Sequence, residues 1–276
     1  MTDAAVVDGG PLVKQLKAKD PDKKRDALRF CTQDARFFRE QPEVLPVLLG
    51  LLARLKVGPS WGHFSSSLKE NDLCTTPELV LDALTTLEAL LAPRLDGDTE
   101  ALQLQGEPGE EGVRPFCISK DDATANSTYV IERCVTDEFE YQGGQPFVAL
   151  ISAPTASNEI KIKAIQVFTT LLEVCIAQSA SVGGSEASTT LSRFQSAGSP
   201  ICALVVCLEA DCAPLQFAAL SCVKLLICSD PNHSLLDEFE SNNGFTRVLQ
   251  LGRHADWRFH DVLLVILDVF SEEASV

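Results

Sequence analysis

The sequence predicts an all-α fold in which helical units stack in a row to form an α-solenoid. The stretch from about Gly198 to Phe270 matches itself at an offset of 45 residues, with Ala210-Asp211 on Ala255-Asp256 and Ala218-Ala219-Leu220 on Leu263-Leu264-Val265. Each copy holds a short apolar helix, a turn with Asp, and a longer helix that is apolar on most sides. Such a helix must be buried on most sides, so one unit needs a neighbour. The composition agrees, because 45% of residues are hydrophobic and only 7% aromatic.

The same plan recurs along the rest of the chain. In the 45-residue pair we expect helices at 201–208 and 215–227, then at 245–251 and 262–270. The stretch PFVALISAPTASNEIKIKAIQVF repeats this plan at an offset of 54, with Pro146 on Pro200. A small residue recurs in the longer helix, where it would let neighbouring helices approach closely. These anchors are Ala27, Ala83, Ala164, Ala218 and, as leucine, Leu263.

The anchor spacings of 56, 81, 54 and 45 residues indicate about five units and one insertion. Helical repeats of this kind run to about 40–47 residues, so the long spacing contains extra chain. We assign it to residues 96–145. Its first part, DGDTEALQLQGEPGEEG, is acidic and glycine-rich. Its second part has two β-prone runs, 114–119 and 127–135, which predict a β-hairpin lying on the solenoid. The insertion is either functional or tolerated decoration.

The N-terminal part begins with a helix over 11–18, because Pro11 suits a first helical turn. A second helix is expected over 23–40, with an apolar face that caps the stack. A third, strongly apolar helix follows over 43–56. After a polar loop at 58–75, Thr76 is the expected N-cap and Pro77 the first residue of a helix that ends near Leu91.

Two further stretches are expected to differ from the stacked helices. Residues 178–197 are rich in serine, glycine and alanine, which predicts a flexible connection. The apolar helix near the C-terminal end is followed only by SEEASV. We therefore expect its outer side to be covered by the insertion, by a partner or second copy, or by further solenoid, and we favour the last two.

The stretches LVKQLKAKDPDKKRDALRF and NNGFTRVLQLGRH resemble armadillo or HEAT-type repeats. The resemblance extends over about four fifths of the chain and implies one α-solenoid domain, residues 1–276, with a concave surface for a protein partner. Importin-like armadillo proteins hold basic peptides on ladders of Trp and Asn. Here neither Trp61 nor Trp257 has Asn four residues later, so binding of nuclear signals is not indicated.

The charge of −16 and pI of about 4.6 restrict the partner. Phosphate backbones favour basic proteins, so nucleic acid is not expected. A protein or peptide with a basic segment fits better, although an acidic surface also serves solubility alone. No signal peptide or membrane span is indicated, and we expect a cytoplasmic or nuclear location. The ten cysteines are read as reduced core residues, since several fall within predicted buried helices.

Few residues suggest a specific site. Trp61 is either a lid over the groove or, as we favour, a plug in the core. Arg25, Arg29 and Arg36 form a basic face that could dock a partner or simply be solvated. The cluster His254, Asp256, Trp257, His260 and Asp261 could contact a partner or bind metal, but capping, packing and solvation explain it more simply. The five cysteines from 202 to 228 lack zinc-site spacing. The glycosylation motif Asn126-Ser127-Thr128 is expected to be silent.

The function predicted is that of a non-enzymatic scaffold or adaptor that binds a partner segment on the solenoid groove, with no cofactor or metal. None of the sequence motifs of hydrolases, metalloproteases or nucleotide-binding proteins is present. The alternative is a chaperone or regulatory factor of the armadillo kind, which grips another protein's folded domain. An enzyme would need a compact pocket with nucleophile and base, for which the sequence offers no candidate.

Overall fold

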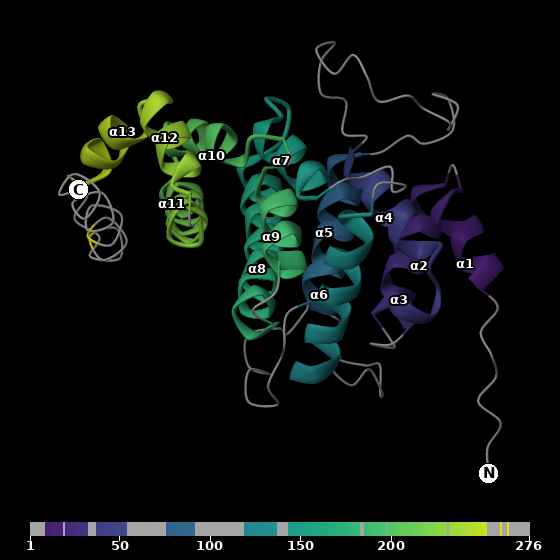
Figure 1. Cartoon of the computed structure of the whole chain (residues 1–276). Coiled ribbons are helices and arrows are strands. Elements are labelled where there is room, and N and C mark those ends of the chain that lie inside the picture. Colours follow the sequence, from purple (N-terminus) through teal and green to yellow (C-terminus); the bar gives the residue numbers. More distant parts are fainter. Residues whose placement is uncertain are drawn as a thin grey trace.

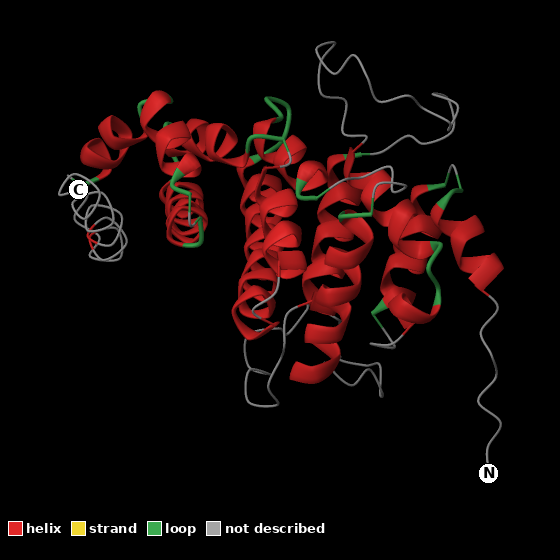
Figure 2. Ribbon diagram, in the orientation of Figure 1, coloured by secondary structure: helices red, strands yellow, loops and turns green. Residues whose placement is uncertain are grey.

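The structure, a computed structural model, describes residues 9–18, 20–32, 37–53, 76–91, 119–136, 143–182, 185–196, 198–230, 232–252, 260 and 264. Every regular element within these ranges is a helix (Figure 2). The helices follow one another in a row from α1 at one end to α13 at the other (Figure 1). None of these helices is long and apolar enough to cross a membrane.

Four helices, which we call the long helices, form one row, in which each packs beside the next. They are α2 (Pro21–Cys31), α5 (Pro77–Leu91), α8 (Asn158–Val182) and α11 (Ala213–Cys228). Pro77 stands at the predicted start of α5, and the backbone N–H of Leu79 donates to Thr76 Oγ1 at 3.3 Å. The predicted helix over 23–40 is divided, because α2 ends at Cys31 and α3 occupies Phe37–Glu40.

Short apolar helices form a second row along one side of the first. They are α1 (Gly9–Leu16), α4 (Val44–Ala53), α7 (Gln145–Ser152), α10 (Pro200–Leu208) and α13 (Gly244–Leu251). Each packs beside the next in the row, and α1, α4, α7 and α10 also pack on the long helix that follows them. This repeated packing confirms the predicted α-solenoid and fits the armadillo/HEAT-type repeats that the sequence resembles.

A third set of helices was not expected from the sequence, apart from α3, which falls within the predicted helix over 23–40. It comprises α3, α6 (Lys120–Cys134), α9 (Ser185–Ser196) and α12 (Ser234–Ser241). Helix α6 packs on α5 and α8, and it also contacts α3 and α9. The described units from α3 to α11 therefore have three helices each: one of the third set, then a short apolar helix, then one of the long helices. The count of five units stays a prediction, since the last unit lies mostly outside the described residues.

The predicted β-hairpin is wrong for residues 120–134, which form α6. The buried positions of α6 follow the helical period: Ala123, Asn126, Ser127, Val130, Ile131 and Cys134. The apolar pattern of a helix is not visible in the sequence here, because two of the buried positions hold the polar residues Asn126 and Ser127. The β-branched residues around them favoured the prediction of strands. The burial of Asn126 also explains why its glycosylation motif would be silent in the folded chain. The acidic first part of the insertion lies outside the described residues.

The predicted flexible connection over 178–197 is also wrong, because α8 continues to Val182 and α9 spans most of the remainder. Leu191 and Phe194 are buried one helical turn apart on α9. The Phe194 ring stacks on Phe168 of α8, with centroids 5.4 Å apart. Two apolar side chains at helical spacing are enough to dock a helix whose other residues are small and polar.

The anchor alanines share one position in the long helices. Ala27, Ala83 and Ala164 are the seventh residues of α2, α5 and α8, and each is at most 1% exposed. In α11 the seventh residue is Ala219, which is fully buried, whereas the predicted anchor Ala218 is only partly buried. The predicted repeat offset was therefore one residue too short at this unit. A methyl group at this position lets adjacent helices pack closely along the row.

Candidate protein-binding surface

The long helices present one continuous surface, which we call the long-helix face. It consists of the second, sixth and ninth residues of each helix, which lie on one helical side at spacings of four and three. All are exposed or partly exposed: Asp22, Asp26 and Arg29 of α2; Glu78, Asp82 and Thr85 of α5; Glu159, Lys163 and Gln166 of α8; Pro214, Ala218 and Ser221 of α11. These residues occupy equivalent positions relative to the buried anchor alanine of each helix.

Ion pairs join neighbouring helices across this face. Arg25 Nε donates to Asp82 Oδ2 at 3.0 Å, which links α2 to α5. Lys163 Nζ donates to Glu88 Oε2, which links α5 to α8. The Arg25 and Asp82 side chains are 38% and 44% exposed, so their pair contributes at most about 1 kcal/mol. These pairs hold the side chains in place more than they stabilise the fold.

The charge of the long-helix face changes along the row. Its residues on α2 and α5 include four carboxylates and the guanidinium of Arg29, and a second guanidinium, that of Arg25, pairs with Asp82, so carboxylates are in excess. On α8 the opposite charges of Glu159 and Lys163 cancel, and on α11 none of the face residues is charged. The pKa of Glu78 is lowered, first by its backbone hydrogen bond and then by the Thr76 hydroxyl, so this carboxylate stays ionised at neutral pH. The face is therefore acidic at the α2–α5 end and neutral at the α11 end.

The structure places two of the three predicted arginines on or beside this face. Arg25 contacts Asp82 and also lies 3.9 Å from Asp22 Oδ1. Arg29 is 80% exposed and lies 4.0 Å from Asp26 Oδ1. Carboxylates thus accompany both guanidinium groups, and the described part of the patch is not basic. Arg36 lies outside the described residues, so its docking role stays a prediction.

Most residues of the other predicted sites lie outside the described residues. These are Trp61, His254, Asp256, Trp257 and Asp261. His260 is described, and it is a helical residue exposed to solvent. Leu264, one turn after His260, is also helical and 65% exposed. Their role in contacting a partner stays a prediction.

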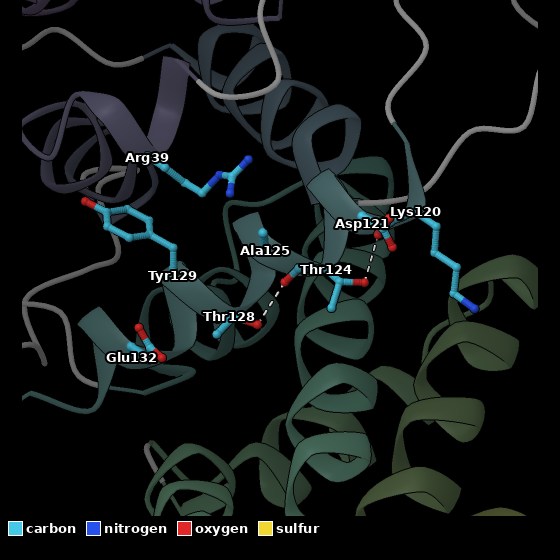
Figure 3. A pocket seen from close by; sticks show the side chains of 8 residues that line it. All are labelled: Arg39, Lys120, Asp121, Thr124, Ala125, Thr128, Tyr129 and Glu132. Atoms are coloured by element: carbon cyan, nitrogen blue, oxygen red, sulfur yellow. Dashed lines mark hydrogen bonds between the residues drawn. The ribbon is translucent and has the colours of Figure 1, made fainter. Parts of the chain in front are cut away.

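A pocket of about 570 Å³ lies away from the long-helix face, between α3 and α6 (Figure 3). The lining residues are Arg39 of α3 and Lys120, Asp121, Thr124, Ala125, Thr128, Tyr129 and Glu132 of α6. Arg39 Nη2 donates to Asp122 Oδ1 at 2.7 Å, and the Thr124 and Thr128 hydroxyls donate to backbone carbonyls one turn earlier. Burial raises the pKa of Tyr129, although Arg133 opposes the change. The described residues of the lining include no histidine or cysteine, so they offer no base–nucleophile pair of the usual kind.

Buried thiols in the core are poor nucleophiles. Burial raises the pKa of Cys31, Cys134 and Cys222 to about 12. The thiolate is the reactive form, so these side chains are inert at neutral pH. Cys202 and Cys228, by contrast, are exposed. Among the described residues, no group of three or more His, Cys, Asp or Glu side chains is arranged to hold a metal ion.

Sequence reasoning missed the residues that define the long-helix face, including Glu78, Asp82, Glu159 and Lys163. The available signal was their shared position, one or five residues before the anchor alanine. That signal becomes a surface only when the long helices are known to pack side by side.

Comparison with known proteins gives structural neighbours only. No family model matches the chain, and no curated protein matches it. A designed armadillo repeat protein in complex with the peptide (KR)4 has 13% sequence identity and a TM-score of 0.40, and the match covers 94% of this chain and 98% of that one. Two engineered proteins of the Northeast Structural Genomics Consortium have TM-scores of 0.41 and 0.39 at 13% and 14% identity. The first match covers 95% of both chains, and the second covers 94% of this chain and 96% of the other.

Proposed function

We propose that this stack of helical units is a non-enzymatic scaffold that holds a segment of a partner protein along the long-helix face. The observation that carries the proposal is the shared register of α2, α5, α8 and α11, which aligns equivalent exposed side chains in a row. Helices packed side by side lie about 8–10 Å apart, so the four span about 25–30 Å. An extended segment of about eight or nine residues has this length.

The chemistry of the segment follows from the charge of the face. Four carboxylates at the α2–α5 end favour lysine or arginine in that half of the segment. The uncharged α11 end favours uncharged side chains in the other half. Charge complementarity of this type raises the association rate and fixes the orientation, and salt weakens it. We propose a cytoplasmic or nuclear location, in which this protein would meet a partner protein with a basic segment.

Pull-down from a cell extract with identification by mass spectrometry tests the proposal. The face variant is Glu78→Lys with Glu159→Lys, which reverses charge at equivalent exposed positions of α5 and α8. The matched control is Asp237→Lys with Glu240→Lys on α12, which makes the same charge change elsewhere. We expect the face variant to lose its specific partners by tenfold or more, about 1.4 kcal/mol, while the control retains them.

The outcome also distinguishes binding of a partner segment on the long-helix face from binding of a partner's folded domain. Equal recovery with both variants would contradict the long-helix face as the binding site. If binding is instead lost on Thr128→Arg, which fills the α3–α6 pocket, the contact lies on the third set of helices. Such a footprint would favour the alternative in which the protein grips a folded domain. Affinity that does not change between low and high salt would remove the electrostatic part of the proposal.

A further inference from the structure

The exposed side chain of Leu249 breaks a pattern that the three helices before it in its row keep, although in α1 the sixth residue, Lys14, is exposed. Leu249 is the sixth residue of α13 and is 63% exposed. The sixth residues of α4, α7 and α10 are Leu49, Leu150 and Val205, which are 0%, 1% and 4% exposed. A following short helix packs beside each of these three helices. Among the described residues α13 is the last helix of its row, so Leu249 occupies a stacking position that nothing described covers.

Leu264 is also exposed at a position that is buried in the preceding unit. Helices α10 and α13 begin 44 residues apart, and at this offset Leu264 falls on Leu220. At the 45-residue offset of the sequence repeat it falls on Ala219. Both Leu220 and Ala219 are 0% exposed, whereas Leu264 is 65% exposed. Two leucines at positions that are buried inside the stack thus meet solvent at its C-terminal side.

At the opposite end of the stack, a charged residue of α2 occupies the position that a buried apolar residue occupies in the other long helices. The third residues of α5, α8 and α11 are Leu79, Ile160 and Leu215, which are at most 2% exposed. The third residue of α2 is Lys23, which is exposed. A polar outer face is expected of a terminal unit that caps a solenoid. Burying Lys23 under a second copy would cost desolvation energy, so head-to-tail stacking is disfavoured.

Within the part of the C-terminal side that the structure describes, α13 offers little charge to oppose the approach of a second copy. Arg247 is the only charged residue of α13, and its Nη2 lies 2.5 Å from Glu209 Oε1 of α10. Thr246 and Gln250, which flank Leu249, are exposed and uncharged. Each chain carries a net charge of −16, so two copies repel each other over most of their surfaces. The electrostatic repulsion between two copies is therefore smallest where they meet through an uncharged surface, such as the one around Leu249.

We propose that two copies of the chain associate through this C-terminal side, with Leu249 and Leu264 of each copy in the contact. A two-fold arrangement follows, because the same face serves both copies and closes the assembly at a dimer. The proposal is independent of partner binding on the long-helix face, so either can fail without the other.

Sedimentation equilibrium of the full chain over about 1–200 μM tests the proposal. We expect a monomer–dimer equilibrium between 29.9 kDa and twice that mass. Leu249→Asp with Leu264→Asp should weaken the dimer at least tenfold. The control is Phe30→Asp on α2, because Phe30 is also an exposed apolar residue, at 37%, and α2 lies at the opposite end of the stack. It should leave the dimer intact, and circular dichroism checks that each variant is folded.

Each other outcome contradicts the proposal. A chain that stays monomeric at 200 μM has no such contact. A dimer that survives the double aspartate variant is formed by another surface. Species larger than a dimer that disappear on Lys23→Glu would show head-to-tail stacking.

Discussion

The side-chain amide of Asn126 donates a hydrogen bond to the backbone carbonyl of Leu90, at 2.9 Å in the buried interior. Leu90 belongs to the last turn of α5, where carbonyl groups have no partner within the helix. Asn126 lies on α6 and is fully buried. Asn126 on α6 thus supplies a hydrogen-bond donor to the C-terminal end of α5, the long helix of the preceding unit.

Asn126→Leu should destabilise the protein, because the Leu90 carbonyl would lose this donor inside the core. The expected loss is about 1–3 kcal/mol of unfolding free energy. The measurement is urea unfolding followed by circular dichroism. Thr124→Ala serves as control, since Thr124 is exposed on the same helix and should change stability by less than about 0.5 kcal/mol. An equal loss in both variants would deny Asn126 this role.

Gly144→Ala should also be destabilising, for a steric reason. A Cβ atom at Gly144 would lie 2.3 Å from Cε2 of Phe168, whose ring is held by stacking on Phe194. Overpacking of this kind costs about 1–3 kcal/mol. The control is Gly252→Ala, where φ is −59° and alanine is tolerated, so stability should stay equal or rise slightly. Thermal unfolding compares the two, and a neutral Gly144→Ala would show that Phe168 can move aside.

Ala83→Leu tests the register of the long helices. Ala83 is fully buried at the anchor position of α5, and a larger side chain there would separate α5 from its neighbours. We expect a loss of about 1–3 kcal/mol in unfolding free energy. Thr85→Leu, on the exposed side of the same helix, should have little effect. Similar stability of the two variants would remove the close-packing role of the anchors.

Asp230 gives stability that depends on pH. Burial acts to raise its pKa, but hydrogen bonds from the Leu235 and Asn232 backbone N–H groups and the Ser234 hydroxyl outweigh burial, and the pKa is lowered. A carboxyl with a lowered pKa in the folded state contributes stability above its unfolded pKa, about 3.9, and loses it as the pH falls through the folded value.

Asp230→Asn should therefore be less stable than the wild type at pH 7, and the difference should shrink below about pH 4. Urea unfolding at a series of pH values measures this difference. The control is Asp211→Asn, which removes an exposed carboxylate before α11. A difference for Asp230→Asn that stayed constant down to pH 2 would assign its effect to shape and not to charge.

The cysteines should react with iodoacetamide at very different rates in the folded protein. Cys202 is exposed, whereas Cys134 and Cys222 are buried and have pKa values of about 12. At pH 8 we expect Cys202 to be modified before these two buried thiols, which should be protected until the protein unfolds. Peptide mass spectrometry follows each site, and the same reaction in urea is the control. Early modification of Cys222 would show that the α8–α11 contact opens readily.

The sequence by itself determined the class of fold and most of the helices in two rows. Long runs of Leu, Val and Ala must be buried whatever their neighbours are, so apolar periodicity alone located α4, α5, α7, α8, α10 and α11. Proline marked the starts of α5, α7 and α10 for local reasons, because it lacks only an N–H that a first helical turn does not use.

Only the tertiary structure decided the third set of helices and the candidate surface. Helix α6 buries Asn126 and Ser127, and α9 docks through Leu191 and Phe194, so neither has a strong apolar period of its own. Both are helical because neighbouring units supply hydrogen-bond acceptors and apolar surface. The long-helix face likewise depends on the depth at which Ala27, Ala83, Ala164 and Ala219 pack. Contacts between residues far apart in the chain set that register, so local sequence preferences cannot predict it.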